Sequence, residues 1–189
     1  MIGSKFFLGV DLGRERDATA LVVVERAVTV GAFDPVTWAR PEVVELRVRH
    51  AERLRLGTRY LDVVEKVRDL ALRVGAAVVA DESGVGAPVV ELLRKRAAGV
   101  RVMGVTITGG GEAQAVDGGW RVSRVELLNG LAVALENQEL AVARCAAGVL
   151  REELRGLRVK GDRVVTEGHD DVVMATALGL WGARKARVR

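Results

Sequence analysis

Cysteine, proline and histidine are scarce in this sequence. Its 189 residues include one cysteine (Cys145), three prolines and two histidines. One cysteine excludes an intramolecular disulfide and agrees with a reducing compartment, and we expect Cys145 to be a small buried residue on a helix. Without a Cys or His cluster the chain offers mainly oxygen ligands for a metal ion, which favours Mg²⁺ or Mn²⁺ over Zn²⁺.

Long apolar runs, linkers and nucleotide-binding loops are also missing. No apolar stretch approaches the ~20 residues of a membrane span, and the first residues lack a signal-peptide pattern, so we expect a soluble, cytoplasmic protein. No Pro-rich or Ser/Gly-rich segment divides the chain, which predicts a single domain over 1–189. The Gly-x-x-x-x-Gly-Lys-Ser/Thr loop of P-loop ATPases is absent from the sequence.

Hydrophobic and basic residues are plentiful. Hydrophobic residues make up 49% of the chain, enough for a substantial core, and the formal net charge is +4. A positive balance suits a polyanionic partner, although a solvated surface of mixed sign gives the same charge. The basic end, 184–189, is either a frayed terminus or a phosphate contact.

The apolar patterns predict three strands followed by alternating helices and strands. Thr58 is the expected cap of the clearest helix, Gly75 its end, and Ser123 with Glu126 forms a capping-box pattern at a later helix. We expect the segment 109–122 to be a flexible loop or a small hairpin. The predicted strands are 6–11, 18–25, 43–48, 76–81, 100–108 and a short 140–143, with a hairpin over 158–166 that turns at Gly161-Asp162; the predicted helices are 60–74, 88–98, 123–137, 146–156 and 170–186.

This order of elements is that of a ribonuclease H-like α/β fold. It predicts a central five-stranded mixed sheet, with three antiparallel strands first and parallel strands after them, flanked by helices and carrying an extra hairpin. In this topology the first and fourth strands are parallel neighbours. Their carboxyl ends, where open α/β sheets bind ligands, then bring Asp11 and Asp81 together.

Four aspartates are candidates for a cation site. Asp11 and Asp81 end apolar runs, and Asp170 and Asp171 open the final helix. Two adjacent carboxylates share a proton or hold a cation, and further carboxylates favour the cation. A pair of Mg²⁺ or Mn²⁺ ions ~3.5 to 4 Å apart can support phosphodiester cleavage. By position Asp170 is the better helix cap and Asp171 the better metal ligand.

Other polar residues lie near these acids, and three of them have two interpretations each. Glu82 follows Asp81 directly, so strand alternation points it to the opposite face. Arg14 and Arg16 lie on the turn after the first strand, where they either hold a phosphate or belong to an exposed mixture of charges. His169 is either a helix-entry residue or a contact to a scissile phosphate.

The chain resembles the nuclease domain of the large subunit of tailed-phage terminases over most of its length. The first matching block alone is weak, and the last, placed before a helix and in order behind the others, is considerably more specific. The blocks are 9–13 (GVDLG), 78–86 (VVADESGVG), 104–110 (GVTITGG), 120–124 (WRVSR) and 168–175 (GHDDVVMA).

The resemblance implies a metal-dependent endonuclease that cuts concatemeric double-stranded viral DNA with little sequence preference during packaging. Carried over by position, Asp11, Asp81 and Asp171 are catalytic metal ligands and Asp170 is an accessory ligand, with Mg²⁺ or Mn²⁺, as two ions, as the cofactor. The segment 109–122 corresponds to a hairpin beside the active site, and Arg124 stands where a lysine is expected. The implied DNA contacts are Arg14, Arg16, Arg121, Arg124 and His169.

The implied partners are double-stranded DNA, the terminase ATPase domain, the small terminase subunit and the portal, in the host cytoplasm and away from any membrane. Since the phosphate loop of the ATPase is missing, ATP hydrolysis and translocation are not expected of this polypeptide. It is either an excised domain or a free-standing relative, and its start close to the first strand favours excision.

Three alternatives stay open at this stage. A Holliday junction resolvase-like endonuclease shares the fold and the carboxylates. A fragment of an actin-like sugar kinase or ATPase shares the segment 9–13, although such proteins need two domains. A non-catalytic DNA-binding or assembly module would carry the acids without using them.

Overall fold

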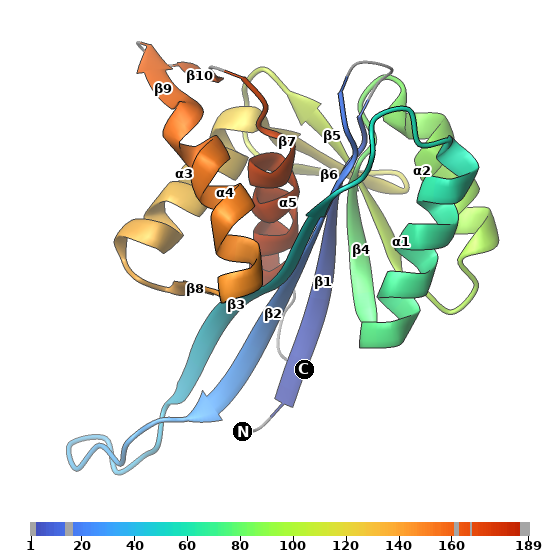
Figure 1. The fold of residues 1–189 in the computed structure, drawn as a ribbon. Coiled ribbons are helices and arrows are strands. Elements are labelled where there is room, and N and C mark those ends of the chain that lie inside the picture. Colours follow the sequence, from blue (N-terminus) through green and yellow to red (C-terminus); the bar gives the residue numbers. More distant parts are fainter. Residues whose placement is uncertain (1–2, 14–16, 161–162, 167, 186–189) are drawn as a thin grey trace.

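The computed structural model describes residues 3–13, 17–160, 163–166 and 168–185. It is a mixed α/β structure in which helices cover both faces of one large sheet (Figure 1). The strands are β1 (Gly3–Asp11), β2 (Ala20–Val30), β3 (Glu42–Arg53), β4 (Ala76–Asp81), β5 (Val102–Thr108), β6 (Gln114–Val116), β7 (Gly119–Ser123), β8 (Leu140–Val142), β9 (Leu157–Lys160) and β10 (Arg163–Thr166). The helices are α1 (Tyr60–Val74), α2 (Gly86–Arg96), α3 (Arg124–Glu136), α4 (Arg144–Gly156) and α5 (Asp171–Lys185).

The large sheet has eight strands in the order β6-β7-β5-β4-β1-β2-β3-β8, and β9 and β10 form a separate two-stranded sheet. As predicted, β1, β2 and β3 form an antiparallel meander, and β4 lies parallel to β1 with β5 parallel to β4. The expected number of five strands is too small. The segment after β5 forms the hairpin β6–β7 and joins the sheet edge through β7, while β8 pairs with β3 at the other edge.

Two hydrophobic cores lie on opposite faces of the sheet. On one face α1 and α2 pack against β1 and β4, with Leu8, Val64 and Val90 completely buried. On the other face α5 lies centrally, with α3 and α4 packed around it (Figure 1). The carboxyl-terminal halves of the neighbouring strands β1 and β4 thus lie in the interior, between helices on both faces of the sheet.

The helix ends follow the sequence signals only in part. Gly75 ends α1 in the left-handed conformation (φ 66°), as expected of a helix stop. Thr58, however, is not the cap of α1: the N-cap residue is Arg59, and the Thr58 hydroxyl donates to the backbone oxygen of Arg55. At α3 the Ser123 side chain accepts the Glu126 N–H (3.1 Å), which confirms that half of the capping box.

Helix α5 is buried on every side from Asp171 to Ala183, which explains why its sequence is apolar all round. It lies very close to β1. A Cβ placed on Gly9 would lie 1.9 Å from the Ala175 backbone oxygen and 2.7 Å from the Gly179 nitrogen. Glycine at position 9 therefore lets the helix approach the strand, and this approach brings the start of α5 to the end of β1.

Two further expectations differ from the structure or fall outside it. Cys145 is exposed rather than buried, at the first turn of α4, and its Sγ lies 3.6 Å from the Arg49 backbone oxygen. The predicted turn at Gly161-Asp162 lies outside the described residues. None of the helices in the described part of the chain is long and apolar enough to cross a membrane.

Candidate functional site

Three elements bring the four aspartates to one edge of the sheet. In the parallel pairing of β1 and β4, Val10 is opposite Ala80, so the next residue of each strand, Asp11 and Asp81, ends its strand beside the other. Neighbouring strands lie about 4.8 Å apart. Helix α5 begins at Asp171, and its closeness to β1 adds Asp170 and Asp171 to the same region.

Asp11 is the electrostatic centre of this group. Burial raises the pKa of its carboxyl well above the usual value, and the charges of Asp81, Asp171 and Asp170 raise it further in that order. The guanidinium of Arg124 acts in the opposite direction on the same pKa. The other three aspartates therefore all lie within electrostatic range of Asp11, and burial and repulsion both act against its charged form.

Asp171 is the more deeply buried of the two aspartates at the start of α5. Burial, followed by the charge of Glu153, raises the pKa of Asp171 to about 6, and the charges of Arg53 and His169 limit this rise. Its Oδ2 atom is buried without a hydrogen bond. The nearest basic groups are Arg53 Nε at 3.5 Å and His169 Nδ1 at 3.8 Å.

The other two aspartates have direct partners. Asp170 accepts a hydrogen bond from the Arg124 guanidinium and is more exposed than Asp171, with side-chain exposures of 21% and 10%. Asp81 accepts the backbone N–H of Ser83 at 2.8 Å. Asp171 thus offers the buried carboxylate oxygen, whereas Asp170 is already engaged by a cation of the chain itself.

These donors fit an oxygen-coordinated divalent cation in chemistry. A positive ion would satisfy the buried Asp171 Oδ2 and remove the repulsion around Asp11. Within the described segments, no three Asp, Glu, His or Cys side chains are close enough together to form a complete metal-binding group. Like charges repel, so a spacing wider than that of a metal-bound site is the expected arrangement of these carboxylates when they stand alone.

The predicted DNA contacts are placed as follows. Arg14 and Arg16 lie outside the described residues. Arg121, on β7, lines an open hollow together with the loop 108–114. Arg124 lies beside the aspartates through Asp170, and the His169 side chain is 58% exposed next to Asp171.

Glu82 is directed away from the aspartates into another ion pair. Its Oε2 atom lies 2.9 Å from Arg94 on α2, and the same guanidinium donates to the Gly118 backbone oxygen at 2.8 Å. This contact connects α2 to the β6–β7 hairpin. The Glu82 side chain thus helps to hold the β6–β7 hairpin against α2.

The sequence analysis did not identify Glu153 and Arg53, which lie beside the aspartates. Glu153, on α4, is 5% exposed, accepts a hydrogen bond from the Arg53 guanidinium, and accepts the Val173 N–H of α5 at 2.9 Å. One signal could have identified it: Ala146, Leu150 and Glu153 follow the helical spacing of the buried face of α4. An acid on that face requires a buried partner.

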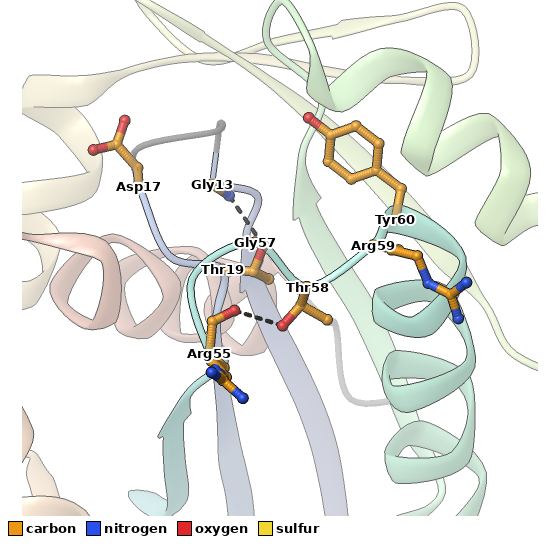
Figure 2. Close-up of a pocket in the computed structure, with 8 residues that line it drawn as sticks. All are labelled: Gly13, Asp17, Thr19, Arg55, Gly57, Thr58, Arg59 and Tyr60. Atoms are coloured by element: carbon orange, nitrogen blue, oxygen red, sulfur yellow. Dashed lines mark hydrogen bonds between the residues drawn. The ribbon is translucent and has the colours of Figure 1, made fainter.

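A polar pocket of about 240 Å³ opens beside the end of β1 (Figure 2). Thr19 and Thr58 lie at its centre; the Thr19 hydroxyl accepts the Gly13 N–H at 3.2 Å. Figure 2 shows the guanidinium groups of Arg55 and Arg59 extending away from it. The remaining residues around the pocket are Gly13, Asp17, Gly57 and Tyr60. Gly13 follows Asp11 by two residues, but none of the four candidate aspartates lines the pocket.

The sheet order, the parallel β1–β4 pair and the helix start at their ends define a ribonuclease H-like fold. Among solved structures, the fold is that of the large terminase nuclease from thermophilic phage G20c, with 22% identity and a TM-score of 0.61 over 95% of this chain and 82% of that one.

Two more solved structures share the fold. One is the same phage's nuclease with bound zinc (23% identity, TM-score 0.61, covering 95% of this chain and 81% of that one). The other is the large terminase (g2p) nuclease domain of bacteriophage SPP1 with bound Mn (12% identity, TM-score 0.59, covering 94% and 86%). No protein-family model and no curated protein matches the chain. At these identities the likeness establishes the fold.

Proposed function

We propose that this chain is a metal-dependent endonuclease of the large terminase type, which cuts double-stranded DNA with little sequence preference during viral DNA packaging. The observation that carries the proposal is the convergence of Asp11, Asp81 and Asp171 from β1, β4 and α5 on one sheet edge, where burial and mutual repulsion raise the pKa of Asp11. The fold of phage terminase nucleases, two of them with a bound metal ion, supports the same assignment.

In this proposal Asp11, Asp81 and Asp171 are the catalytic metal ligands and Asp170 is an accessory ligand. They would hold Mg²⁺ or Mn²⁺, as two ions, which would supply an activated water and stabilise the leaving oxygen of the phosphodiester. Ser83 fixes the Asp81 carboxylate through its backbone N–H (2.8 Å). Arg124 holds Asp170 from the other side of the group.

The proposed DNA contacts surround the aspartates. Arg121 and Arg124 approach from β7 and the start of α3, and His169 from the loop before α5. Arg55, at the rim of the neighbouring pocket, is a further candidate; its guanidinium extends away from the pocket and forms no ion pair with the described residues. Arg14 and Arg16 remain candidates on their sequence position alone. Arginine suits this task because its planar group binds phosphate through two parallel hydrogen bonds.

The proposal also covers the substrate, the location and the partners of the activity. The chain would act on concatemeric DNA in the host cytoplasm, as a single nuclease domain over 1–189, together with a terminase ATPase domain, the small subunit and the portal. It contains no phosphate-loop sequence of its own, so the motor activity would belong to another polypeptide or domain.

The test is cleavage of supercoiled plasmid, linear duplex and a four-way junction with Mn²⁺, with Mg²⁺ and with EDTA. We expect divalent-dependent nicking of plasmid and duplex by the wild-type chain. Asp11→Asn and Asp81→Asn should abolish it and keep the fold, while Asp69→Asn, at a 70% exposed carboxylate of α1, should leave it unchanged. Undiminished cleavage by either active-site variant would refute the assignment.

The same assay separates the alternatives. Strong preference for the junction with symmetric nicks would instead indicate a Holliday junction resolvase-like enzyme. DNA binding without any cleavage would indicate a non-catalytic module. Thermal stabilisation by nucleotide without divalent-dependent nicking would indicate a fragment of an actin-like kinase or ATPase.

A further inference from the structure

Glu153 uses both of its carboxylate oxygens in contacts around the start of α5. Oε2 accepts the Val173 N–H at 2.9 Å, and Oε1 accepts a hydrogen bond from Arg53. The Glu153 side chain is only 4% exposed. Each oxygen of Glu153 thus already has a partner within the protein, which points to a role in holding those partners.

Arg53 lies between two carboxylates. Its terminal nitrogen donates to Glu153, and its Nε lies 3.5 Å from Asp171 Oδ2, beyond the usual length of a hydrogen bond. That Oδ2 atom is the buried oxygen without a hydrogen bond. The guanidinium is therefore committed to Glu153 and only adjacent to Asp171.

We propose that Glu153 is a positioning residue for Asp171: it holds the Arg53 guanidinium so that the buried oxygen of Asp171 stays available to a divalent cation. This inference rests on the proposed function, in which Asp171 is a metal ligand. Arginine and a carboxylate readily form two parallel hydrogen bonds. Released from Glu153, Arg53 would turn to Asp171 in this way and compete with the cation for both of its oxygens.

Glu153 could instead have a purely structural role at the start of α5, and this role predicts unchanged Mn²⁺ affinity as long as its hydrogen bond to the helix is kept. Glu153 also satisfies one of the backbone N–H groups at the start of α5, which have no partner within the helix. Glu153→Gln separates the two roles because the amide oxygen can still accept the Val173 N–H while the charge that attracts Arg53 is lost.

The experiment measures Mn²⁺ affinity of the full chain by calorimetry without DNA, alongside melting in EDTA. We expect Glu153→Gln to weaken Mn²⁺ binding about tenfold, the size usual for outer-shell partners of metal ligands. Arg53→Gln in the same chain should restore most of that affinity, since the competing guanidinium is gone. The matched control is Glu152→Gln, at the exposed neighbouring position of α4, which should bind Mn²⁺ as the wild type does.

Several results would overturn the inference. One is wild-type Mn²⁺ affinity in a folded Glu153→Gln chain; another is failure of Arg53→Gln to rescue it. If Glu153→Gln does not fold, the test is the single variant Arg53→Gln. It should bind Mn²⁺ at least as tightly as the wild type, and weaker binding would refute the idea that Arg53 competes with the cation for Asp171. If wild-type protein binds no Mn²⁺ at all, the proposed metal site itself fails, and this inference with it.

Discussion

Replacing Asp171 by asparagine should stabilise the metal-free protein at neutral pH. The rise of the Asp171 pKa from 3.8 to about 6 means that the folded chain disfavours the charged carboxylate. For this largely buried side chain, the rise corresponds to at most about 3 kcal/mol of stability lost above pH 6. In a chain of this size, a gain of that amount raises Tm by about 6 to 12 °C.

The pH dependence has a definite sign. Between about pH 4 and pH 6 the folded state binds more protons at Asp171 than the unfolded state, so the penalty grows as pH rises and is absent below about pH 4. We therefore expect the stability difference between Asp171→Asn and wild type to be largest above pH 6 and to vanish near pH 4.

The assay is chemical denaturation in EDTA at several pH values. Asp69→Asn, which removes an exposed carboxylate, is the control and should stay within about 0.5 kcal/mol of wild type at each pH. Added Mn²⁺ should stabilise the wild type and not Asp171→Asn, because a ligand stabilises only the state that binds it. A pH-independent difference, or destabilisation by Asp171→Asn in EDTA, would refute the burial and repulsion on which the site is based.

Three further outcomes are expected. Gly9→Ala should destabilise the fold by about 3 kcal/mol in denaturation, because its Cβ would lie 1.9 Å from the Ala175 oxygen, whereas Gly3→Ala, with open space around it, should be nearly neutral. Arg124→Gln should lower stability in EDTA by about 1 kcal/mol, with most of the loss recovered in Mn²⁺; equal losses in both conditions would contradict its role as a counter-ion. Arg55→Ala should weaken duplex binding in Ca²⁺ and reduce the slope of log affinity against log salt by about 0.9, and an unchanged slope would exclude a phosphate contact.

The strand ends of the site could be predicted from sequence because they depend on local patterns and one topological rule. An apolar run ending in an acid locates Asp11 and Asp81, and the parallel pairing of the first and fourth strands, confirmed by the register of Val10 with Ala80, makes them neighbours. A short strand over 140–143 and a possible hairpin over 109–122 were predicted, but their places in the large sheet were not, because no local pattern shows that β8 pairs with β3 or β7 with β5.

Contacts between distant segments explain the remaining misses. The Arg53 guanidinium lies between the carboxylates of Glu153 and Asp171. Because the three residues belong to β3, α4 and α5, no local sequence pattern could predict this contact. The prediction that Thr58 caps α1 failed locally: the helix begins one residue later, after Arg59, and the Thr58 hydroxyl donates to the Arg55 backbone oxygen in the preceding turn. Sequence patterns thus identify which residues end an element but not which partner their side chains choose.

The balance of charge around Asp11 bears on how the proposed substrate could approach. The carboxylates of Asp11, Asp81, Asp170, Asp171 and Glu153 face the guanidinium groups of Arg53 and Arg124. The acids of this group outnumber its arginines, and each DNA phosphate adds another negative charge. On the proposed function, divalent cations must therefore bind before or together with the scissile phosphate. On the same proposal, arginines outside the group, such as Arg55 and Arg121, would hold the duplex with or without the metal, so DNA affinity and cleavage should depend differently on metal.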